Sequence, residues 1–481
     1  MGSLLSAEIR CEETDLLRRA YRNILELHLD SAQYYTQKSR SLDPDNILVE
    51  LLESYDDFLR GFINEDEVSL ERFRRSKSNR LDRLEKIKLD SPYIDFMRAE
   101  INLQWALVRS KHKEYIRAGW DINRAYKLLI RCKKEYPDFM LADKSLSVIH
   151  SLVGSIQGFR RGLMRIFTAL DGSIEDGLEE INRADVRSLE EESIWRAEIL
   201  IIKSLLQRHI DRDPAEGLNT LKQLGPICDA SPLVRFLMGA CTQDIGDNDA
   251  AIEYWSWETT AGQLPFYYMD FVKGIGLLNK LDNSAKKYLL RYIHHHPGEQ
   301  YQKEARQKMA WYELIINDDI PKYKNWMLAC LKEGITDFGE DQQAYQEAKS
   351  GIIPNISLLR ARLLYDGGQF HRAMDQLSEN PNFKNEDILE YHYRMARILH
   401  AQDQKRSAIL EYIKVISEGD EDQRYYACNA ALQVGLIMTE LQRPSQAKHY
   451  FEVCISMHPE EYQEALHQKA RLGLQRLHLE K

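Results

Sequence analysis

The histidines His294, His295 and His296 and the acidic stretch DGSIEDGLEE, which begins at Asp171, carry the side chains best suited to metal binding. Three consecutive histidines on a helix point in three directions, so they cannot hold one metal from a single face. In the acidic stretch the glycine stands at position 7 of the stretch, whereas a calcium-binding loop needs it at position 6. We therefore expect a helix end before Pro297, a helix start in the acidic stretch, and no metal site.

Motifs for nucleotide binding and nucleophilic catalysis are incomplete. The stretch GIGLLN at Gly274 lacks the third glycine and the preceding strand of a dinucleotide site. In GSIQG, Gly154–Gly158, the serine directly follows the glycine, whereas a nucleophile elbow requires one residue between them. The phosphate-binding pattern Gly-x4-Gly-Lys-Ser/Thr does not occur. The sequence therefore predicts no cofactor, and an enzyme with an unrecognised site is the least favoured function.

The seven cysteines are widely scattered, and no two stand at Cys-x-x-Cys spacing. This distribution excludes a metal knuckle and a thioredoxin-like motif. Cys241, Cys428 and Cys454 fall within apolar helical patterns, where cysteine acts as a small buried hydrophobe. A disulfide framework is therefore not expected, although an isolated bridge stays open.

Arg362 and Arg397 have the clearest potential for binding chemistry. A guanidinium is a planar fork of donors that matches a carboxylate with two parallel hydrogen bonds. Two such groups along one groove would favour an acidic peptide segment or the C-terminal carboxylate of a partner. The alternative is that each arginine pairs with an acid of a neighbouring helix, so the elements that carry them decide the question.

The stretch MGACTQDIGDNDAAIEYW, Met238–Trp255, has the pattern of a helix–turn–helix hairpin. Small residues at Gly239 and Ala251 let two helix backbones approach each other, and a bulky tryptophan follows one turn later. The turn contains a glycine, and we expect Asp247 or Asn248 to cap the second helix. The stretch is therefore a bend between packed helices and not a ligand loop.

The same pattern recurs along the second half of the sequence. The corresponding alanines Ala373, Ala408 and Ala447 are separated by 35 and 39 residues, which brackets the 34-residue tetratricopeptide period. One segment, Lys332–Pro354, breaks the register. On these residues, the region Glu191–Lys481 resembles the tetratricopeptide-repeat (TPR) proteins. The resemblance implies stacked helical hairpins with a concave binding face.

The N-terminal half is helical but less regular. Two long helices are predicted in SPYIDFMRAEINLQWALVRSKHKEYIRAGWDINRAYKLLIRCKKEYPDF, with Ser91 and Pro92 starting the first and Pro137 ending the second. Glycines in Ser151–Ile181 indicate tight helix crossings. Through these segments the protein resembles large exported TPR proteins of the Bacteroidetes type. That resemblance implies an exported, periplasmic or envelope-associated protein, with a cytoplasmic location as the alternative, and it implies no chemistry.

Together these patterns predict an all-α fold, a right-handed α-α superhelix of the TPR-like solenoid type with an irregular helical N-terminal half. Residues 1–12 are expected to be a flexible leader or tag remnant, 13–190 an N-terminal helical region, and 191–481 the hairpin array. The segment EEYQEALHQKARLGLQRL is expected to cap the array with a polar-faced helix. The 13 prolines and 24 glycines leave little room for the turns of an all-β fold.

The net charge of −10 argues against nucleic-acid binding, which needs an excess of basic side chains. The basic run Arg72–Lys88 contains acids at helical spacing, so a solvated helix face is favoured over a phosphate or lipid site. No apolar run reaches the roughly 18 residues that a membrane-spanning helix needs. The start, MGSLLS, fits a myristoylation pattern at Gly2, but a cloning remnant or the end of a removed export signal is favoured.

Aligning the hairpins on the alanine of their second helix assigns a set of first-helix residues to the concave face. They are Leu358, Arg362, Tyr365, Tyr393, Arg397, His400, Asn429, Leu432 and Thr439.

We expect Arg362, Tyr365, Tyr393, Arg397, His400 and Asn429 to contact an extended or helical segment of a protein partner, with an acidic segment favoured. The predicted function is a non-catalytic protein–protein interaction scaffold. The alternative is a small-molecule or glycan module that uses the aromatic cluster at 255–271, although these aromatics also fit the core between hairpins. The oligomeric state is left open.

Overall fold

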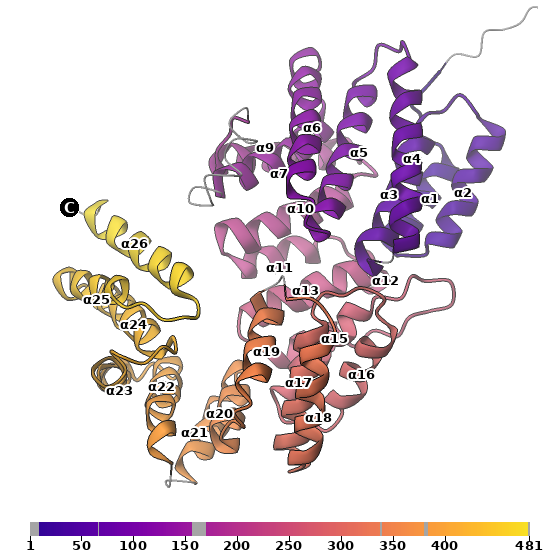
Figure 1. Ribbon diagram of the computed structural model, residues 1–481. Coiled ribbons are helices and arrows are strands. Elements are labelled where there is room, and N and C mark those ends of the chain that lie inside the picture. The colour runs from indigo at the N-terminus through magenta and orange to yellow at the C-terminus, as the bar shows by residue number, and fades with distance from the viewer. Residues whose placement is uncertain (1–8, 66, 156–169, 337–338, 380–382, 480–481) are drawn as a thin grey trace, which may run out of the picture. The chain divides into compact units, whose positions relative to one another are not determined.

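The computed structural model describes residues 9–65, 67–155, 170–336, 339–379 and 383–479 (Figure 1). Over these residues the regular elements are helices, and the β-type pairing is an isolated bridge between Arg10 and Asn46. The predicted all-α fold is confirmed. The myristoylation pattern at Gly2 and most of the GSIQG stretch lie outside the described residues.

Within these described ranges, none of the helices has the combined length and apolar character that crossing a membrane requires.

The protein forms two compact units. Unit 1 consists of Met1–Lys273 and Tyr288–Gln300, and unit 2 consists of Gly274–Lys287 and Tyr301–Lys481. The division between the two units does not coincide with the predicted boundary after residue 190. The helices before and after that boundary pack on each other and belong to the same unit. The boundary therefore stays a prediction of where the repeat pattern begins, not of where a compact unit ends.

Unit 1 is built from helices of unequal length that pair in antiparallel hairpins. They are α1 (Asp15–Leu25), α2 (Leu29–Leu42), α3 (Leu48–Asn64), α4 (Glu67–Lys86), α5 (Pro92–Lys111), α6 (Tyr115–Glu135), α7 (Met140–Ser155), α9 (Ile174–Glu190), α10 (Arg196–Leu206), α11 (Pro214–Lys222), α12 (Ile227–Ala230), α13 (Pro232–Asp244) and α14 (Asn248–Tyr254). The helices α15 (Tyr267–Leu278) and α16 (Ala285–His295) contribute residues to both units. The long helices α4, α5 and α6 lie side by side in Figure 1.

Several predicted helix ends in unit 1 are confirmed. Ser91 caps α5 by accepting a hydrogen bond from the backbone of Tyr93, with Pro92 in the first turn. Ser173 and Asp176 form a reciprocal capping box at the start of α9, so the acidic stretch is a helix start. Asp247 caps α14 by accepting from the backbone N–H of Ala250.

The close approach predicted for the hairpin α13–α14 is present. A Cβ atom at Gly239 would lie 2.3 Å from Nε1 of Trp255, which is 2% exposed and donates to the carbonyl of Phe236. The last hairpin repeats this arrangement, since a Cβ at Gly435 would lie 2.5 Å from the ring of Phe451. In both hairpins a large ring occupies the volume that a larger residue in the first helix would need.

The prediction of a solvated face for the basic run Arg72–Lys88 is wrong for Lys77 and Arg80. Both are buried, and they pair with Asp121 and Asp57 at 2.9 and 2.8 Å. Helical spacing places these two cations toward acids of α3 and α6, which sequence alone does not bring together. The basic charge of this segment is therefore largely neutralised inside unit 1.

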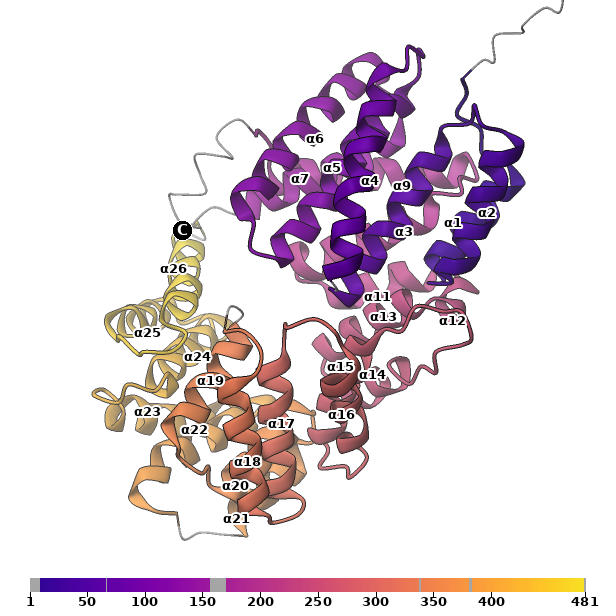
Figure 2. The same ribbon diagram turned by 45° about the vertical axis from the view of Figure 1, so that its right-hand side comes forward.

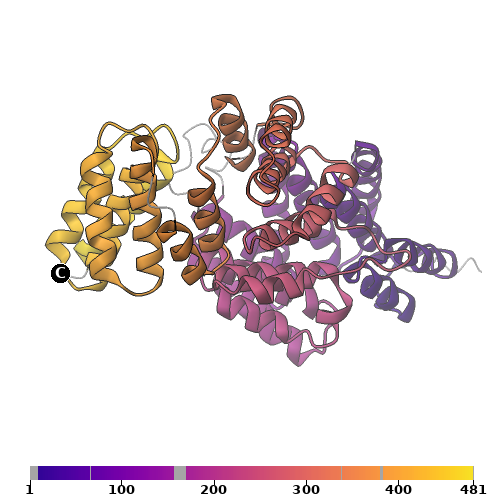
Figure 3. The ribbon, with the colours of Figure 1, turned by 90° about the horizontal axis from the view of Figure 1, so that it is seen from below.

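Unit 2 is a row of helical hairpins. Its helices are α17 (Gln302–Ile315), α18 (Ile320–Lys332), α19 (Gly339–Ser350), α20 (Ile356–Asp366), α21 (Phe370–Ser378), α22 (Asn385–Ala401), α23 (Lys405–Glu418), α24 (Tyr426–Glu440), α25 (Pro444–Ser456) and α26 (Gln463–Leu479). Figure 3 shows the last helices of this array, coloured light orange to yellow, side by side. The final helix α26 packs on α24 and α25, as the predicted cap should.

The predicted break in the repeat register corresponds to the extra helix α19, which lies against α17 and α18 (Figure 2). Asp341 of α19 is fully buried and accepts from the backbone N–H groups of Tyr301, Lys303 and Glu304 at 2.7 to 2.9 Å. These N–H groups begin α17 and have no partner within their own helix. The inserted helix therefore supplies the N-terminal cap of the helix it covers.

Candidate functional site

The first helices of three successive hairpins in unit 2, α20, α22 and α24, bring most of the predicted site residues together. We call the resulting group the arginine–tyrosine cluster. It comprises Arg362, Tyr365, Asp366, Glu390, Tyr393, Arg394, Arg397, Tyr425, Tyr426 and Asn429.

Each predicted arginine lies on an aromatic ring of the preceding first helix. The guanidinium carbon of Arg397 lies 4.0 Å from the ring centre of Tyr365, and that of Arg362 lies 4.9 Å from the ring centre of Trp311 on α17. A guanidinium stacked on a ring face is stabilised by the ring quadrupole and keeps its N–H edge free to bind. Arg362 and Arg397 therefore occupy equivalent positions, as the repeat alignment predicts.

The two arginines share one carboxylate. Asp366 lies 3.4 Å from Arg397 and 3.9 Å from Arg362, and about a third of its side chain and of that of Arg362 is exposed. The alternative of pairing with an acid of a neighbouring helix is thus realised for Arg397 only, since Asp366 and Arg362 belong to the same helix α20. At these distances the carboxylate cannot make a two-pronged hydrogen bond with each guanidinium.

Arg394 is a third guanidinium, deeper than the other two. Its side chain is 2% exposed, and its Nε and Nη2 donate to Glu390 at 3.0 and 2.8 Å. Burial alone would raise the pKa of Glu390, but the charge of Arg394 holds it below its ordinary value. The remaining nitrogen, Nη1 of Arg394, is buried and has no acceptor among the described residues. A buried donor without a partner costs stability, so this atom has capacity for an added acceptor.

Two tyrosine rings lie beside the guanidinium of Arg394. The ring of Tyr393 stacks on Tyr426 at 4.8 Å, and Arg394 lies 5.6 and 5.7 Å from the two ring centres. Asn429 donates to the hydroxyl oxygen of Tyr393 at 2.7 Å. Burial raises the pKa of Tyr393 above its ordinary range, so the hydroxyl stays neutral at physiological pH.

Not all predicted positions reach the cluster. His400 stacks edge-on against Tyr412 near the end of α22, and burial lowers its pKa. Leu358, Leu432 and Tyr393 are each 1% exposed, so they are buried between the helices and their assignment to the concave surface is wrong. Thr439 donates to the carbonyl of Gly435 in its own helix. The alignment predicted which side of its helix each residue lies on, but it did not predict how deeply each side chain is buried between the hairpins.

The sequence prediction missed Glu390, Arg394, Tyr426 and Trp311. A signal existed for the first two, because Glu390 and Arg394 are four residues apart and Arg394 precedes Arg397 by three, which places all of them along one helix face. Trp311 lies beyond the break in the repeat register, so the alignment did not extend to it.

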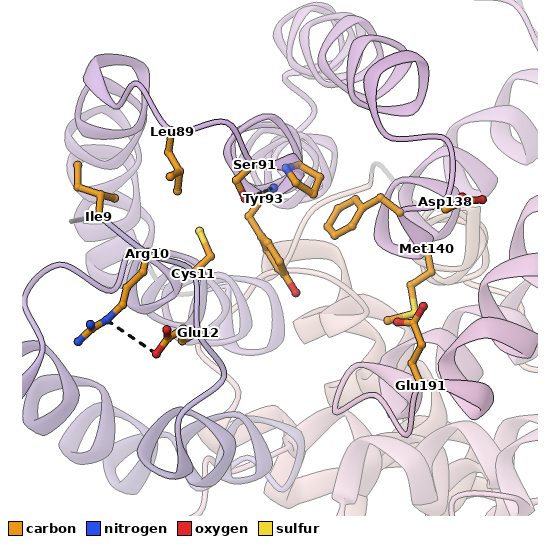
Figure 4. Close-up of a pocket in the computed structure, with 12 residues that line it drawn as sticks. Ile9, Arg10, Cys11, Glu12, Leu89, Ser91, Tyr93, Asp138, Met140 and Glu191 are labelled. Carbon is orange, nitrogen blue, oxygen red and sulfur yellow. Dashed lines mark hydrogen bonds and ion pairs between the residues drawn. The ribbon is translucent and has the colours of Figure 1, made fainter.

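A second candidate is a cavity of about 590 Å³ in unit 1 (Figure 4). Its lining residues are Ile9, Arg10, Cys11, Glu12, Leu89, Ser91, Pro92, Tyr93, Asp138, Phe139, Met140 and Glu191. In Figure 4 Tyr93 lies between Cys11 on one side and Met140 and Glu191 on the other.

The charged groups of this cavity are largely engaged elsewhere. Arg10 pairs with Asp43 at 2.8 Å, and Asp138 pairs with Arg187. Burial raises the pKa of Cys11 to about 11, so its thiol is protonated and a poor nucleophile. In the described residues there is also no group of three His, Cys, Asp or Glu side chains that could hold a metal ion. The cavity thus offers volume without convergent reactive groups.

The aromatic cluster at 255–271 is packed. The space beside Trp255, Trp257 and Phe266 measures about 10 Å³, which is room for about one water molecule. Trp257 donates to Gln263 at 3.0 Å, and Gln263 in turn donates to the backbone carbonyl of Glu26, the residue that ends α1. These contacts attach the loop after α14 to α1, so the core interpretation of this cluster fits the structure better than the glycan interpretation.

Comparison with known proteins gives no family. No protein-family model matches the sequence, and no curated protein matches it. Among solved structures, the human IFIT1 dimer with m7Gppp-AAAA is 14% identical, and the match covers 99% of this protein and 97% of that one with a TM-score of 0.30. The yeast Tom70 structure is 13% identical, and the match covers 96% and 88% with a TM-score of 0.25. With TM-scores this low, neither likeness bears on what this protein binds.

Proposed function

We propose that the protein is a non-catalytic binding scaffold, and that its arginine–tyrosine cluster holds an acidic segment of a protein partner across α20, α22 and α24. The supporting observation is the charge balance of the cluster. Arg362 and Arg397 share the carboxylate of Asp366, Arg394 pairs with Glu390, and the charges of Glu347 and Glu461 also act on Arg362. A carboxylate from a partner would bind the partly exposed guanidinium groups of Arg362 and Arg397, which share one acid at 3.9 and 3.4 Å.

The surroundings of the arginines strengthen such an interaction. Ring faces of Trp311 and Tyr365 cover one side of each guanidinium, which removes water from the binding groups. Between partly desolvated groups a charge-assisted hydrogen bond contributes about 1.5–3 kcal/mol, more than between fully hydrated groups. The periodic spacing of the first helices suits an extended or helical segment that carries acids at more than one position.

The charge of the whole protein favours a peptide over a nucleic acid. With a net charge of −10 the protein repels a phosphate backbone at long range, whereas a short acidic segment needs only the local excess of arginine. A small-molecule site in the unit 1 cavity is the second candidate, and its volume of about 590 Å³ is the observation that favours it. Export from the cell remains a prediction from the sequence resemblance.

A display library of short random peptides, selected on the full-length protein, tests the proposal. We expect the selected peptides to be enriched in aspartate and glutamate. Binding of a selected, fluorescently labelled peptide should weaken at least tenfold in the double variant Arg362→Gln and Arg397→Gln, because the variant loses both charged donors. A tenfold loss corresponds to about 1.4 kcal/mol of binding free energy. It should also weaken as salt is raised.

Arg406→Gln is the matched control, since Arg406 is exposed on the second helix α23 and lies outside the cluster. This variant should bind like the wild type. Selected peptides without acids, or equal binding by the double variant, would contradict the proposal, provided that circular dichroism shows the variant to be folded.

A further inference from the structure

Two thiols meet inside the last hairpin of unit 2. Cys428 of α24 and Cys454 of α25 are 1% and 0% exposed, and their Sγ atoms lie 3.6 Å apart. Cys428 also lies 3.3 Å from the carbonyl oxygen of Cys454. All seven cysteines are free in the structure. A disulfide has an S–S length of about 2.05 Å, so the two sulfur atoms need to approach by only about 1.5 Å.

A cavity of about 220 Å³ reaches one member of the pair. Its walls are Gly419 to Arg424, Ala427 and Cys428 on one side, and Ser456 to Pro459 on the other. Cys428 is part of this lining and Cys454 is not. The volume is several times that of a water molecule, which is enough for a small hydroperoxide.

The pKa values of the two thiols differ as well, and they also favour Cys428 as the more reactive one. The hydrogen bond between them lowers the pKa of Cys428, and it raises the pKa of Cys454. The thiolate is the reactive form of cysteine, so the thiol beside the cavity is also the one more easily deprotonated.

We propose that Cys428 and Cys454 form a thiol-oxidation site, in which a small hydroperoxide entering the cavity oxidises Cys428 and Cys454 then closes a disulfide between α24 and α25. This proposal is independent of the proposed function.

The reaction is balanced with hydrogen peroxide as oxidant. The Cys428 sulfur attacks one peroxide oxygen, the O–O bond breaks, and the departing hydroxide takes up the thiol proton as water, which leaves a sulfenic acid. The Cys454 sulfur then attacks the Cys428 sulfur, the S–O bond breaks, and the hydroxyl leaves as water with the Cys454 proton. Two thiols are oxidised to one disulfide, and one peroxide is reduced to two waters.

Peptide mass spectrometry of the full-length protein after peroxide treatment tests the site. Lys448 lies between the two cysteines, so trypsin places them in separate peptides, Tyr425–Lys448 and His449–Lys469. We expect a linked pair of these peptides, lighter by two hydrogens than their sum, and no such product in Cys428→Ser or Cys454→Ser. In Cys454→Ser a sulfenic-acid trap such as dimedone should label Cys428.

Cys330→Ser is the matched control, since Cys330 is buried in α18 of the same unit, away from this hairpin. It should leave the linked peptide at wild-type yield. The link should form in the folded protein and give way to mixed pairings when the protein is oxidised in urea. If Cys11 or Cys228, both only partly buried, is oxidised while the pair stays reduced, or if dimedone does not label Cys428, the proposal is overturned.

Discussion

At the residue scale, the decisive group is Arg394. The repeat alignment did not select it, and its side chain lies beneath the surface, beside the stacked rings of Tyr393 and Tyr426. A buried guanidinium needs partners for its donors, and Glu390 satisfies two of them. The remaining nitrogen, Nη1, is buried and has no acceptor among the described residues.

Replacing Arg394 by Met should destabilise unit 2 by about 3 kcal/mol, because it leaves the carboxylate of Glu390 without its partner. The double variant Arg394→Met and Glu390→Leu should recover much of this loss, since no lone charge remains. Urea unfolding followed by circular dichroism measures both. A double variant that is as unstable as the sum of its single changes would contradict this interpretation of the pair.

A second residue-scale prediction concerns pH. Burial lowers the pKa of His150, but the hydrogen bond and charge of Glu180, 2.9 Å away, outweigh it and raise the pKa above 6.5. A raised folded-state pKa stabilises the fold fully below pH 6.5, and the contribution is lost as pH rises through the folded-state value. Thermal unfolding should therefore show the advantage of wild type over His150→Gln shrinking as pH rises above 6.5.

His400 provides the opposite control. Burial lowers its pKa below 6.5, so the folded state resists protonation, and wild type should lose stability relative to His400→Gln as pH falls below 6.5. If both variants show the same sign of pH dependence, the assigned environments are wrong.

At the element scale, the hairpins depend on close helix crossings. Gly239→Ala should destabilise unit 1 by roughly 1–3 kcal/mol, because the new methyl group would overlap the indole of Trp255. Gly61→Ala is the matched helical control, since a Cβ there meets no atom within 4 Å. It should be neutral or stabilise by about 0.5–1 kcal/mol. Chemical unfolding compares the two, and an equal effect of both changes would argue against the crossing.

The inserted helix α19 makes a separate prediction. Asp341→Ala should destabilise unit 2 by about 2 kcal/mol, because three backbone N–H groups at the start of α17 lose their acceptor. The neighbouring Glu340 is exposed, so Glu340→Ala should have little effect. Hydrogen exchange at Tyr301, Lys303 and Glu304 reports the cap directly, and unchanged exchange in Asp341→Ala would contradict its role.

At the scale of the whole molecule, the sequence predicted the recurrent elements better than the way they assemble. The crossing of Gly239 and Trp255 could be predicted because it is local and repeats elsewhere in the protein. The extent of unit 1 could not, since it depends on pairings such as the backbone hydrogen bond from Leu264 to Leu27, between residues far apart in the sequence. No periodic pattern encodes such a contact.

The candidate site also contains residues that the sequence could predict and residues that it could not. Arg362 and Arg397 could be found because they recur at matching positions of two hairpins. The ring of Trp311 and the buried Arg394 required the packing between helices to be known, since depth is a property of neighbouring hairpins and not of spacing. Two predicted leucines are core residues for the same reason.

The central claim is that the protein holds an acidic segment on the first helices of unit 2, and amide hydrogen exchange tests it most directly. A selected acidic peptide added to the full-length protein should slow exchange in α20, α22 and α24, and the same peptide with its acids changed to amides should not. Slowed exchange in residues 9–12 and 89–93, with none in those three helices, would place the binding site in the unit 1 cavity and contradict the claim.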